Sequence, residues 1–180
     1  MAAMTMKAVR MHRYGGPEVL VYEDAPRPEP GEGEILIRVH AAGVNPLDWK
    51  VRAGRLKDRL QHKLPLIPGW DVSGVVESLG PAVESPQVGE QVFARLDTRR
   101  DGAYAEYTVS DARIVAKKPL SIDHVLAASV PLASLTAWQA LFEAGQLVPG
   151  QRVLIHGAAG SVGAFAVQFA KQKGAWSRPP

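Results

Sequence analysis

The sequence of 180 residues contains no cysteine. This absence excludes a disulfide framework, a cysteine nucleophile and a zinc site built on thiolates. No stretch approaches the ~20 consecutive apolar residues that a membrane-spanning helix needs. The segment from Met1 to Lys7 also lacks the apolar core of a secretory signal. The sequence therefore predicts a cytoplasmic protein without a membrane segment.

Long runs of one charge are also lacking. The 21 Lys and Arg residues exceed the 18 Asp and Glu residues by only three, and the longest basic stretches are Arg99-Arg100 and Lys117-Lys118. Nucleic-acid binding needs basic residues gathered on one face or in a run, so we expect no nucleic-acid partner. The five histidines are scattered without an HExxH spacing, and we expect no metal site. No Gly-x-Ser-x-Gly elbow supports a serine hydrolase.

The first two thirds of the chain have the pattern of short β-strands. Apolar and polar residues alternate from Lys7 to His12, and the segment from Glu34 to His40 is rich in β-branched residues. Further strands are predicted at residues 19–22, 72–79, 91–95, 104–109 and 113–116. Many short strands between turn residues favour a partly closed β-barrel, which removes exposed strand edges. We predict that residues 1–132 form this domain.

The pattern changes to helices after residue 120. Ser121 and Ser134 are predicted to cap two helices, the second of which continues to Glu143. An apolar strand follows at residues 152–156, then a glycine-rich loop and a helix over residues 161–173. This strand-loop-helix order opens a parallel α/β sheet. We predict that residues 133–180 form an incomplete Rossmann domain containing only this first unit.

The glycine-rich loop is the most informative segment. Gly157, Gly160 and Gly163 follow a strand directly and precede a helix. In a dinucleotide-binding loop the first glycine makes the tight turn, the second lets the backbone approach a pyrophosphate, and the third lets helix and strand pack closely. The helix N-terminus then offers free N–H groups to the phosphates. The alternative is a turn that only joins a strand to a helix. No Gly-Lys-Ser or Gly-Lys-Thr follows, so a P-loop is not indicated.

Three motifs together resemble one protein family. The first runs from Gly150-Gln151 through Gly160 and Gly163 to Gln168 and Lys171, with Ser161 in place of the usual glycine. The second is the segment from Gly43 to Asp48, followed by Arg52-Ala-Gly54. The third is Pro68-Gly-Trp-Asp-Val-Ser-Gly-Val-Val76. With these motifs the chain resembles the zinc-independent quinone oxidoreductases of the medium-chain dehydrogenase/reductase superfamily, over roughly Met6 to Gly174.

The resemblance implies a GroES-like β-rich catalytic domain followed by a Rossmann domain that binds NADPH. It implies hydride transfer from NADPH to a quinone or an α,β-unsaturated carbonyl compound, with a homodimer possible in the full-length family. The implied catalytic residues are Asn45 and Asp48. The implied cofactor-binding residues are Asn45, Thr136, Gly157, Ala159, Gly160, Val162 and Gly163. Zinc-dependent relatives have cysteine and histidine where this chain has Asn45 and Trp70, which also argues against a metal.

Each implied site residue has a purely structural alternative. Asn45 precedes Pro46, and Asn-Pro favours a turn. Asp48 suits a helix cap or a turn, and Thr136 suits the first turn of a helix. Trp138 is expected in the core. Tyr104 and Tyr107 are expected on a barrel strand without a chemical role.

The motifs do not identify the acceptor of the hydride. Many relatives have a tyrosine two places after the aspartate, where this chain has Lys50 beside Trp49. An enoyl-thioester reductase, or a GroES-like module that binds without catalysis, therefore remain as alternatives.

The last residues predict a truncated domain. The segment from Ala175 to Pro180 has no run of β-branched residues, and Pro179-Pro180 does not suit a central strand. We therefore expect an N-terminal portion of a longer enzyme that is inactive alone. One helix face is expected to find few partners; it comprises Val162, Phe165, Ala166, Phe169 and Ala170.

Overall fold

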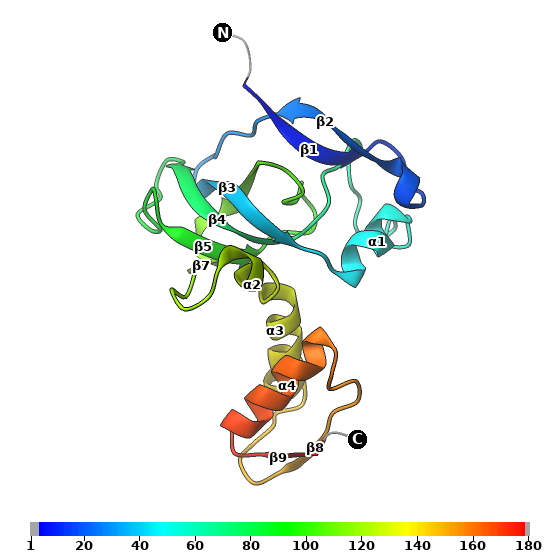
Figure 1. Cartoon of the computed structure of the whole chain (residues 1–180), viewed down its shortest axis with the longest axis vertical. Coiled ribbons are helices and arrows are strands. Elements are labelled where there is room, and N and C mark those ends of the chain that lie inside the picture. Colours follow the sequence, from blue (N-terminus) through cyan, green and yellow to red (C-terminus); the bar gives the residue numbers. More distant parts are fainter. Residues whose placement is uncertain (1–3, 179–180) are drawn as a thin grey trace. The chain divides into compact units, whose positions relative to one another are not determined.

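The computed structural model describes residues 4–178. The chain forms two compact units, one ending at Ser129 and the other beginning at Val130 (Figure 1). The sequence pattern placed a domain boundary between residues 132 and 133.

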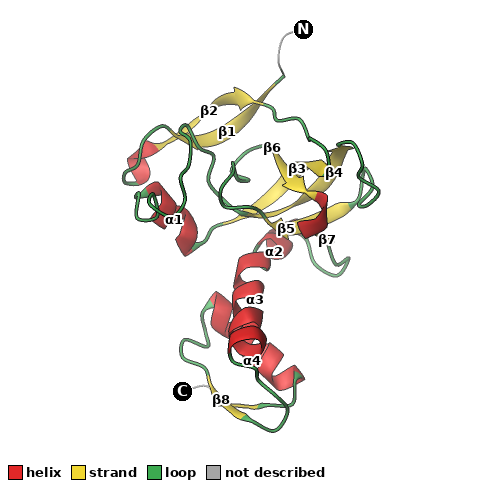
Figure 2. Cartoon of the chain, turned by 180° about the vertical axis from the view of Figure 1, so that it is seen from behind, coloured by secondary structure: helices red, strands yellow, loops and turns green. Residues whose placement is uncertain are grey.

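The first unit is built from antiparallel sheet (Figure 2). Strands β1 (Thr5–Met11) and β2 (Leu20–Pro26) pair with each other. A second sheet has the strand order β6-β3-β4-β5-β7. Its strands are β3 (Glu34–Gly43), β4 (Asp71–Leu79), β5 (Gln91–Arg95), β6 (Tyr107–Asp111) and β7 (Val115–Lys117). Isolated bridges from Ala8 to Ala105 and from Met11 to Leu66 attach β1 to the rest of the unit.

The core of this unit follows from the alternation of apolar residues along the strands. Ile35 and Ile37 on β3, Val72 and Val76 on β4, and Val92 on β5 are all buried in one cluster. The predicted strand at 91–95 is confirmed to the residue. The strand predicted from residue 104 begins only at Tyr107. The N–H groups of residues 102–104 bond instead to the carbonyls of Ile67, Gly69 and Pro68, so this segment cannot join the ladder earlier.

Three short helices lie between strands of the first unit, and a fourth follows its last strand. They are η1 (Pro17–Val19), α1 (Pro46–Arg52), η2 (Ala112–Ile114) and α2 (His124–Ala128). The prediction that Ser121 caps a helix is wrong. Asp123 is the N-cap of α2, and its side chain accepts the N–H of Leu126 at 2.8 Å.

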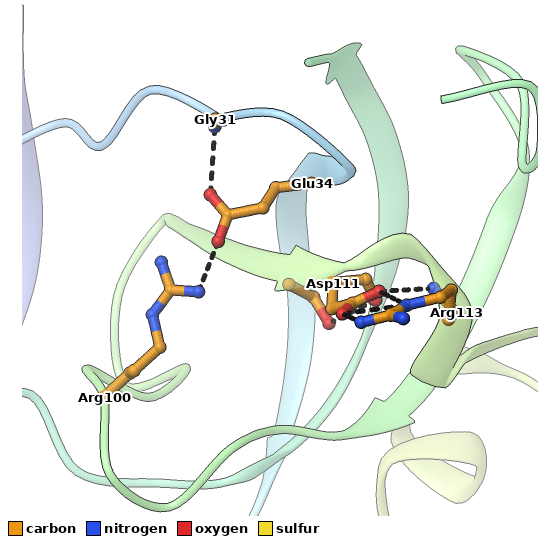
Figure 3. A network of polar contacts seen from close by, with 6 residues as sticks. Gly31, Glu34, Arg100, Asp111 and Arg113 are labelled. Carbon is orange, nitrogen blue, oxygen red and sulfur yellow. Dashed lines mark hydrogen bonds and ion pairs between the residues drawn. The ribbon is translucent and has the colours of Figure 1, made fainter. Parts of the chain in front are cut away.

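Polar contacts hold the loops at one end of the β3–β6 pair (Figure 3). The Glu34 carboxylate accepts hydrogen bonds from the backbone N–H of Gly31 and from the guanidinium of Arg100, and the Arg100 contact lowers the pKa of Glu34. Beside it, Arg113 contacts both carboxylate oxygens of Asp111 and lowers the pKa of Asp111 to about 2. The contact between Arg100 and Glu34 joins segments that are 66 residues apart in sequence.

The second unit contains α3 (Pro131–Trp138), the π-helical segment η3 (Gln139–Ala144), β8 (Arg152–Leu154), α4 (Ser161–Gln172) and β9 (Trp176–Arg178). The prediction that Ser134 caps the helix is wrong. Val130 is the N-cap, Pro131 occupies the first turn, and the Ser134 hydroxyl donates to the carbonyl of Pro131 at 3.3 Å inside the helix. A proline at the first helical position is favourable because its missing N–H has no intrahelical partner there.

The prediction that no second strand follows α4 is wrong. Gly174, with φ +77°, ends the helix, and the N–H of Trp176 bonds to the carbonyl of Gln151 at 2.8 Å. Strand β9 then pairs with β8 in parallel, so the unit contains a complete β-α-β crossover. Pro179 and Pro180 lie outside the described residues.

The expected lack of partners for α4 is also wrong. Ala166 and Ala170 are buried, and Phe165 and Phe169 pack against the same cluster, to which η3 contributes Leu141. Val162 is 38% exposed. Most of the predicted apolar face is therefore covered by the second unit's own residues.

Candidate functional site

Asn45 and Asp48 form the beginning of α1. Asn45 is the N-cap, with extended backbone at φ −126° and ψ 158°, and Pro46 takes the first helical position. The backbone N–H of Asn45 donates to Oδ2 of Asp48 at 2.6 Å, which is the acidic half of a capping box. Asn45 and Asp48 therefore do form a helix cap, as the structural alternative for each residue predicted. The hydrogen bond of this cap also holds the two residues in a fixed position relative to each other.

The side chain of Asn45 is held by Asp71. Nδ2 of Asn45 donates to Oδ2 of Asp71 at 3.0 Å, and Asp71 is 1% exposed at the start of β4. A carboxylate accepts hydrogen bonds, so this contact requires the NH₂ end of the amide. The amide oxygen of the half-buried Asn45, which faces the backbone N–H of Asp48 in the capping box, keeps a second lone pair for a ligand. Gly43 permits this approach, since a Cβ there would lie 2.9 Å from Cβ of Asp71.

Asp48 receives a second donor from a residue far along the chain. The hydroxyl of Tyr104 donates to Oδ2 of Asp48 at 2.9 Å. Asp48 is 6% exposed, and its Oδ1 has no hydrogen-bond partner among the described residues. Burial raises the pKa of Asp48, while the bonds from Asn45 and Tyr104 oppose that rise. Burial, followed by the charge of Asp48, raises the pKa of Tyr104, so its hydroxyl remains a donor at neutral pH.

We call Asn45, Asp48, Asp71 and Tyr104 the polar cluster. Sequence reasoning found the first two and missed the other two. Tyr104 was assigned to a strand, yet its ring lies over Gly69, where a Cβ would approach a ring carbon to 2.2 Å. The sequence could have pointed to Asp71, which is an acid in an otherwise apolar strand, because buried carboxylates are rare unless they are paired.

The glycine-rich loop lies in the second unit. Gly157 has φ +68°, which favours glycine and makes the tight turn after β8. Gly160 is the N-cap of α4, and its N–H bonds to the carbonyl of Gly157 at 2.9 Å. Gly163 is buried, and a Cβ there would lie 2.2 Å from the same carbonyl oxygen. Gly157 and Gly163 thus have the backbone geometry expected of the first and third glycines of a dinucleotide-binding loop.

A pocket of about 450 Å³ opens beside this loop. Val162 and Ser161 line it together with the three loop glycines, whereas Ala159 is exposed outside its lining. Among the described residues, no side chain caps the N-terminus of α4. Its first-turn N–H groups therefore lack intrahelical partners and carry a partial positive charge, which suits an anionic ligand.

The sequence predicted Thr136 in the first turn of a helix, and this prediction is wrong. It is the sixth residue of α3, and its hydroxyl donates to the carbonyl of Leu132 at 2.7 Å. The loop pocket is lined by the neighbouring Ala137. The expectation that Trp138 lies in the core is wrong, because its side chain is 49% exposed against the edges of Phe142 and Phe169.

Residues 4–178 hold neither a metal-binding cluster nor a membrane-spanning helix. No group of three or more His, Asp or Glu residues there has the geometry to hold a metal ion. No helix in this range is long and apolar enough to cross a bilayer.

Comparisons with known proteins agree on one superfamily. The model of the alcohol dehydrogenase GroES-like domain matches residues 31–120. Human quinone oxidoreductase is 38% identical over 170 residues, which are 94% of this chain and 50% of that protein. The quinone oxidoreductase structure from Coxiella burnetii superposes with a TM-score of 0.87 at 38% identity, covering 98% of this chain and 56% of that one.

A mycobacterial relative was solved in complex with NADPH. It has a TM-score of 0.83 at 36% identity and covers 97% of this chain and 51% of that one. The chain spans about half the length of the curated relatives that it matches.

Proposed function

We propose a function on the premise that this chain belongs to the medium-chain dehydrogenase/reductase superfamily, as a quinone oxidoreductase-like member with a GroES-like domain. The 180 residues supply the substrate-side domain and the phosphate-binding unit of an NADPH-dependent reductase. The acceptor is a quinone or an activated carbon–carbon double bond.

The observation that carries the cofactor assignment is the glycine-rich loop between β8 and α4. A Cβ at Gly163 would clash with the loop backbone, and the uncapped α4 leaves N–H groups for a pyrophosphate. Gly157, Gly160 and the backbone of Val162 would hold the phosphates. The NADPH-bound mycobacterial relative supports the same ligand. When bound, the nicotinamide ring supplies the hydride.

The polar cluster orients groups at the substrate side. Asp71 fixes the amide of Asn45 so that its oxygen is the accepting end, which suits the carboxamide of a nicotinamide. Asp48 and Tyr104 hold the backbone turn that presents Asn45. We assign Asn45 to ligand contact and the other three residues to its positioning.

The cofactor assignment is tested by titrating the purified chain with NADPH and recording the fluorescence of the reduced nicotinamide. Gly160→Asp places a carboxylate where the phosphates would bind. A Cβ at this position would lie 3.3 Å from its nearest neighbour, so the fold tolerates the substitution after a small shift. We expect Gly160→Asp to weaken binding at least about tenfold, as one lost charge-assisted bond would.

Gln168→Glu is the matched control. Gln168 is exposed on α4, and its substitution adds the same charge away from the loop. Equal affinities of wild type and Gly160→Asp, with circular dichroism unchanged, would remove the loop from the site. A panel of 1,4-benzoquinone, an enone and an enoyl thioester, each supplied with NADPH, then assigns the acceptor.

A further inference from the structure

A strongly basic segment follows Asn45 and Asp48 in the sequence. Residues 50–63 contain six cations and one acid, Asp58, and thus a local charge of +5 in a chain of net charge +3; the remaining residues sum to −2. We call these cations the basic segment: Lys50, Arg52, Arg55, Lys57, Arg59 and Lys63. The net positive charge of the whole chain is therefore concentrated in the segment that begins five residues after Asn45.

In the part of the chain that the structure describes, none of these cations forms an ion pair. Every ion pair found in residues 4–178 involves other basic residues. Arg52 instead donates to the backbone carbonyl of Gly15 at 3.4 Å. A cluster of unpaired like charges repels itself, and it is stabilised by an anion that binds to it.

Two of the cations are gathered on one aromatic ring. Cζ of Arg55 lies 4.7 Å and Nζ of Lys50 lies 5.9 Å from the centre of the Trp49 ring. Gly54, with φ +72°, turns the chain after α1, and the N–H of Arg55 bonds to the carbonyl of Lys50 at 3.0 Å. This turn brings Arg55 back beside Trp49, which is 38% exposed. The two cations and the indole form one surface.

The surface is close to Asn45 along the same helix. Helix α1 directs Asp48 and Val51 inward and exposes Trp49 and Lys50. Asn45 and Lys50 are five residues apart, which is about 7.5 Å along a helix axis and about 140° around it. An acceptor near Asn45 therefore meets these cations through a substituent that extends along and around the helix.

We propose that the electron acceptor of this protein carries an anionic group, which Lys50 and Arg55 bind while Trp49 contacts its ring system. The acceptor class is a quinone or enone bearing a carboxylate, sulfonate or phosphate. This inference rests on the proposed function, from which it takes the acceptor chemistry. Both cations that would bind the anionic group belong to the first unit.

The test is binding, because it needs no turnover. The chain is titrated with anthraquinone-2-sulfonate and with neutral 2-(hydroxymethyl)anthraquinone while the side-chain N–H signals of its four tryptophans are followed by NMR. The absence of cysteine excludes thiol adducts with the quinones. We expect the sulfonate to bind more tightly and to shift the signal of Trp49 before the other three.

Charge variants separate a site from general attraction. K50Q/R55Q should raise the Kd of the sulfonate about fivefold at about 20 mM salt, as expected for two exposed ion pairs, and the effect should shrink at about 300 mM salt. R99Q/K171Q is the matched control, since it removes the same charge from exposed positions elsewhere. Equal weakening by both double variants, or equal affinity for the charged and neutral quinones, would overturn the proposal.

A parallel titration with NADPH distinguishes the sources of the anion. If K50Q/R55Q weakens NADPH as much as it weakens the sulfonate, the cations serve the cofactor phosphates and the proposal is overturned. If wild type binds the sulfonate as expected but does not bind NADPH, the anion site stands and the cofactor assignment fails.

Discussion

Removing one hydroxyl tests how the polar cluster is held. Tyr104→Phe deletes the donor to Asp48 Oδ2 and leaves the backbone N–H of Asn45 as the remaining partner. Asp48 is 6% exposed, so solvent cannot easily replace the lost donor. A hydrogen bond to a charged group contributes about 1.5–3 kcal/mol, and we expect Tyr104→Phe to lower the free energy of unfolding of the first unit by this amount at neutral pH.

The loss should depend on pH with a defined sign. Burial raises the pKa of Asp48 in the folded state, so the folded chain holds more protons than the unfolded chain and stability falls as pH rises through that range. Removing the Tyr104 donor raises this pKa further and makes the fall steeper. At acidic pH more of the carboxyl is protonated than at neutral pH, and the loss should shrink toward the roughly 0.5–1.5 kcal/mol of a neutral bond.

Native-state hydrogen exchange in increasing urea measures this stability on peptides from β3 and β4, so the first unit is read by itself. Tyr107→Phe is the control, because the Tyr107 ring contacts Arg27 and the polar cluster does not include it. In an Asp48→Asn background, Tyr104→Phe should lower the free energy of unfolding only by the roughly 0.5–1.5 kcal/mol of a neutral hydrogen bond. An equal loss at both pH values would show that packing of the ring, and not the bond to a carboxylate, determines the effect.

Three further outcomes are expected. Gly163→Ala places a Cβ 2.2 Å from the carbonyl oxygen of Gly157, and the forced shift should destabilise the second unit by about 1–3 kcal/mol. Hydrogen exchange of the amides of α4 measures this loss. Unchanged protection of α4 would show that the loop can move to accommodate the methyl group. Burial lowers the pKa of His124, so the folded chain binds fewer protons and stability is lost as pH falls below the ordinary histidine range. His124→Gln should flatten the unfolding free energy below about pH 6.5, the ordinary histidine pKa, and an unaltered slope would assign it to another group. Arg113→Gln should return the carboxyl pKa of Asp111 from about 2 toward its ordinary value, as followed by carbon NMR, and a pKa that stays low would contradict the pairing.

The sequence predicted most of the first unit because its strands follow a simple alternation. It predicted the glycine-rich loop because the spacing of three glycines reports directly on backbone conformation. It misplaced the helix caps at Ser121 and Ser134, since Asp123 caps α2 and α3 begins at Pro131 after Val130.

The missed parts depend on contacts between distant residues. The bond from Tyr104 to Asp48 joins residues 56 positions apart, and the bond from Asn45 to Asp71 joins residues 26 positions apart. Strand β9 was missed because its pairing with β8 comes from the α4 crossover and not from β-branched residues in its own sequence. A local sequence pattern cannot predict which distant residue a side chain or strand contacts.

The contact between Asn45 and Asp71 also bears on how the protein ages. Asparagine side chains commonly lose ammonia when the backbone nitrogen of the following residue attacks the amide, but that nitrogen belongs here to Pro46 and carries no hydrogen. Asn45 is the only asparagine in the chain. Conversion to aspartate would set a second carboxylate against the buried Asp71 in place of the 3.0 Å bond. The proline that begins α1 thus also protects the chemical identity of the side chain beside it.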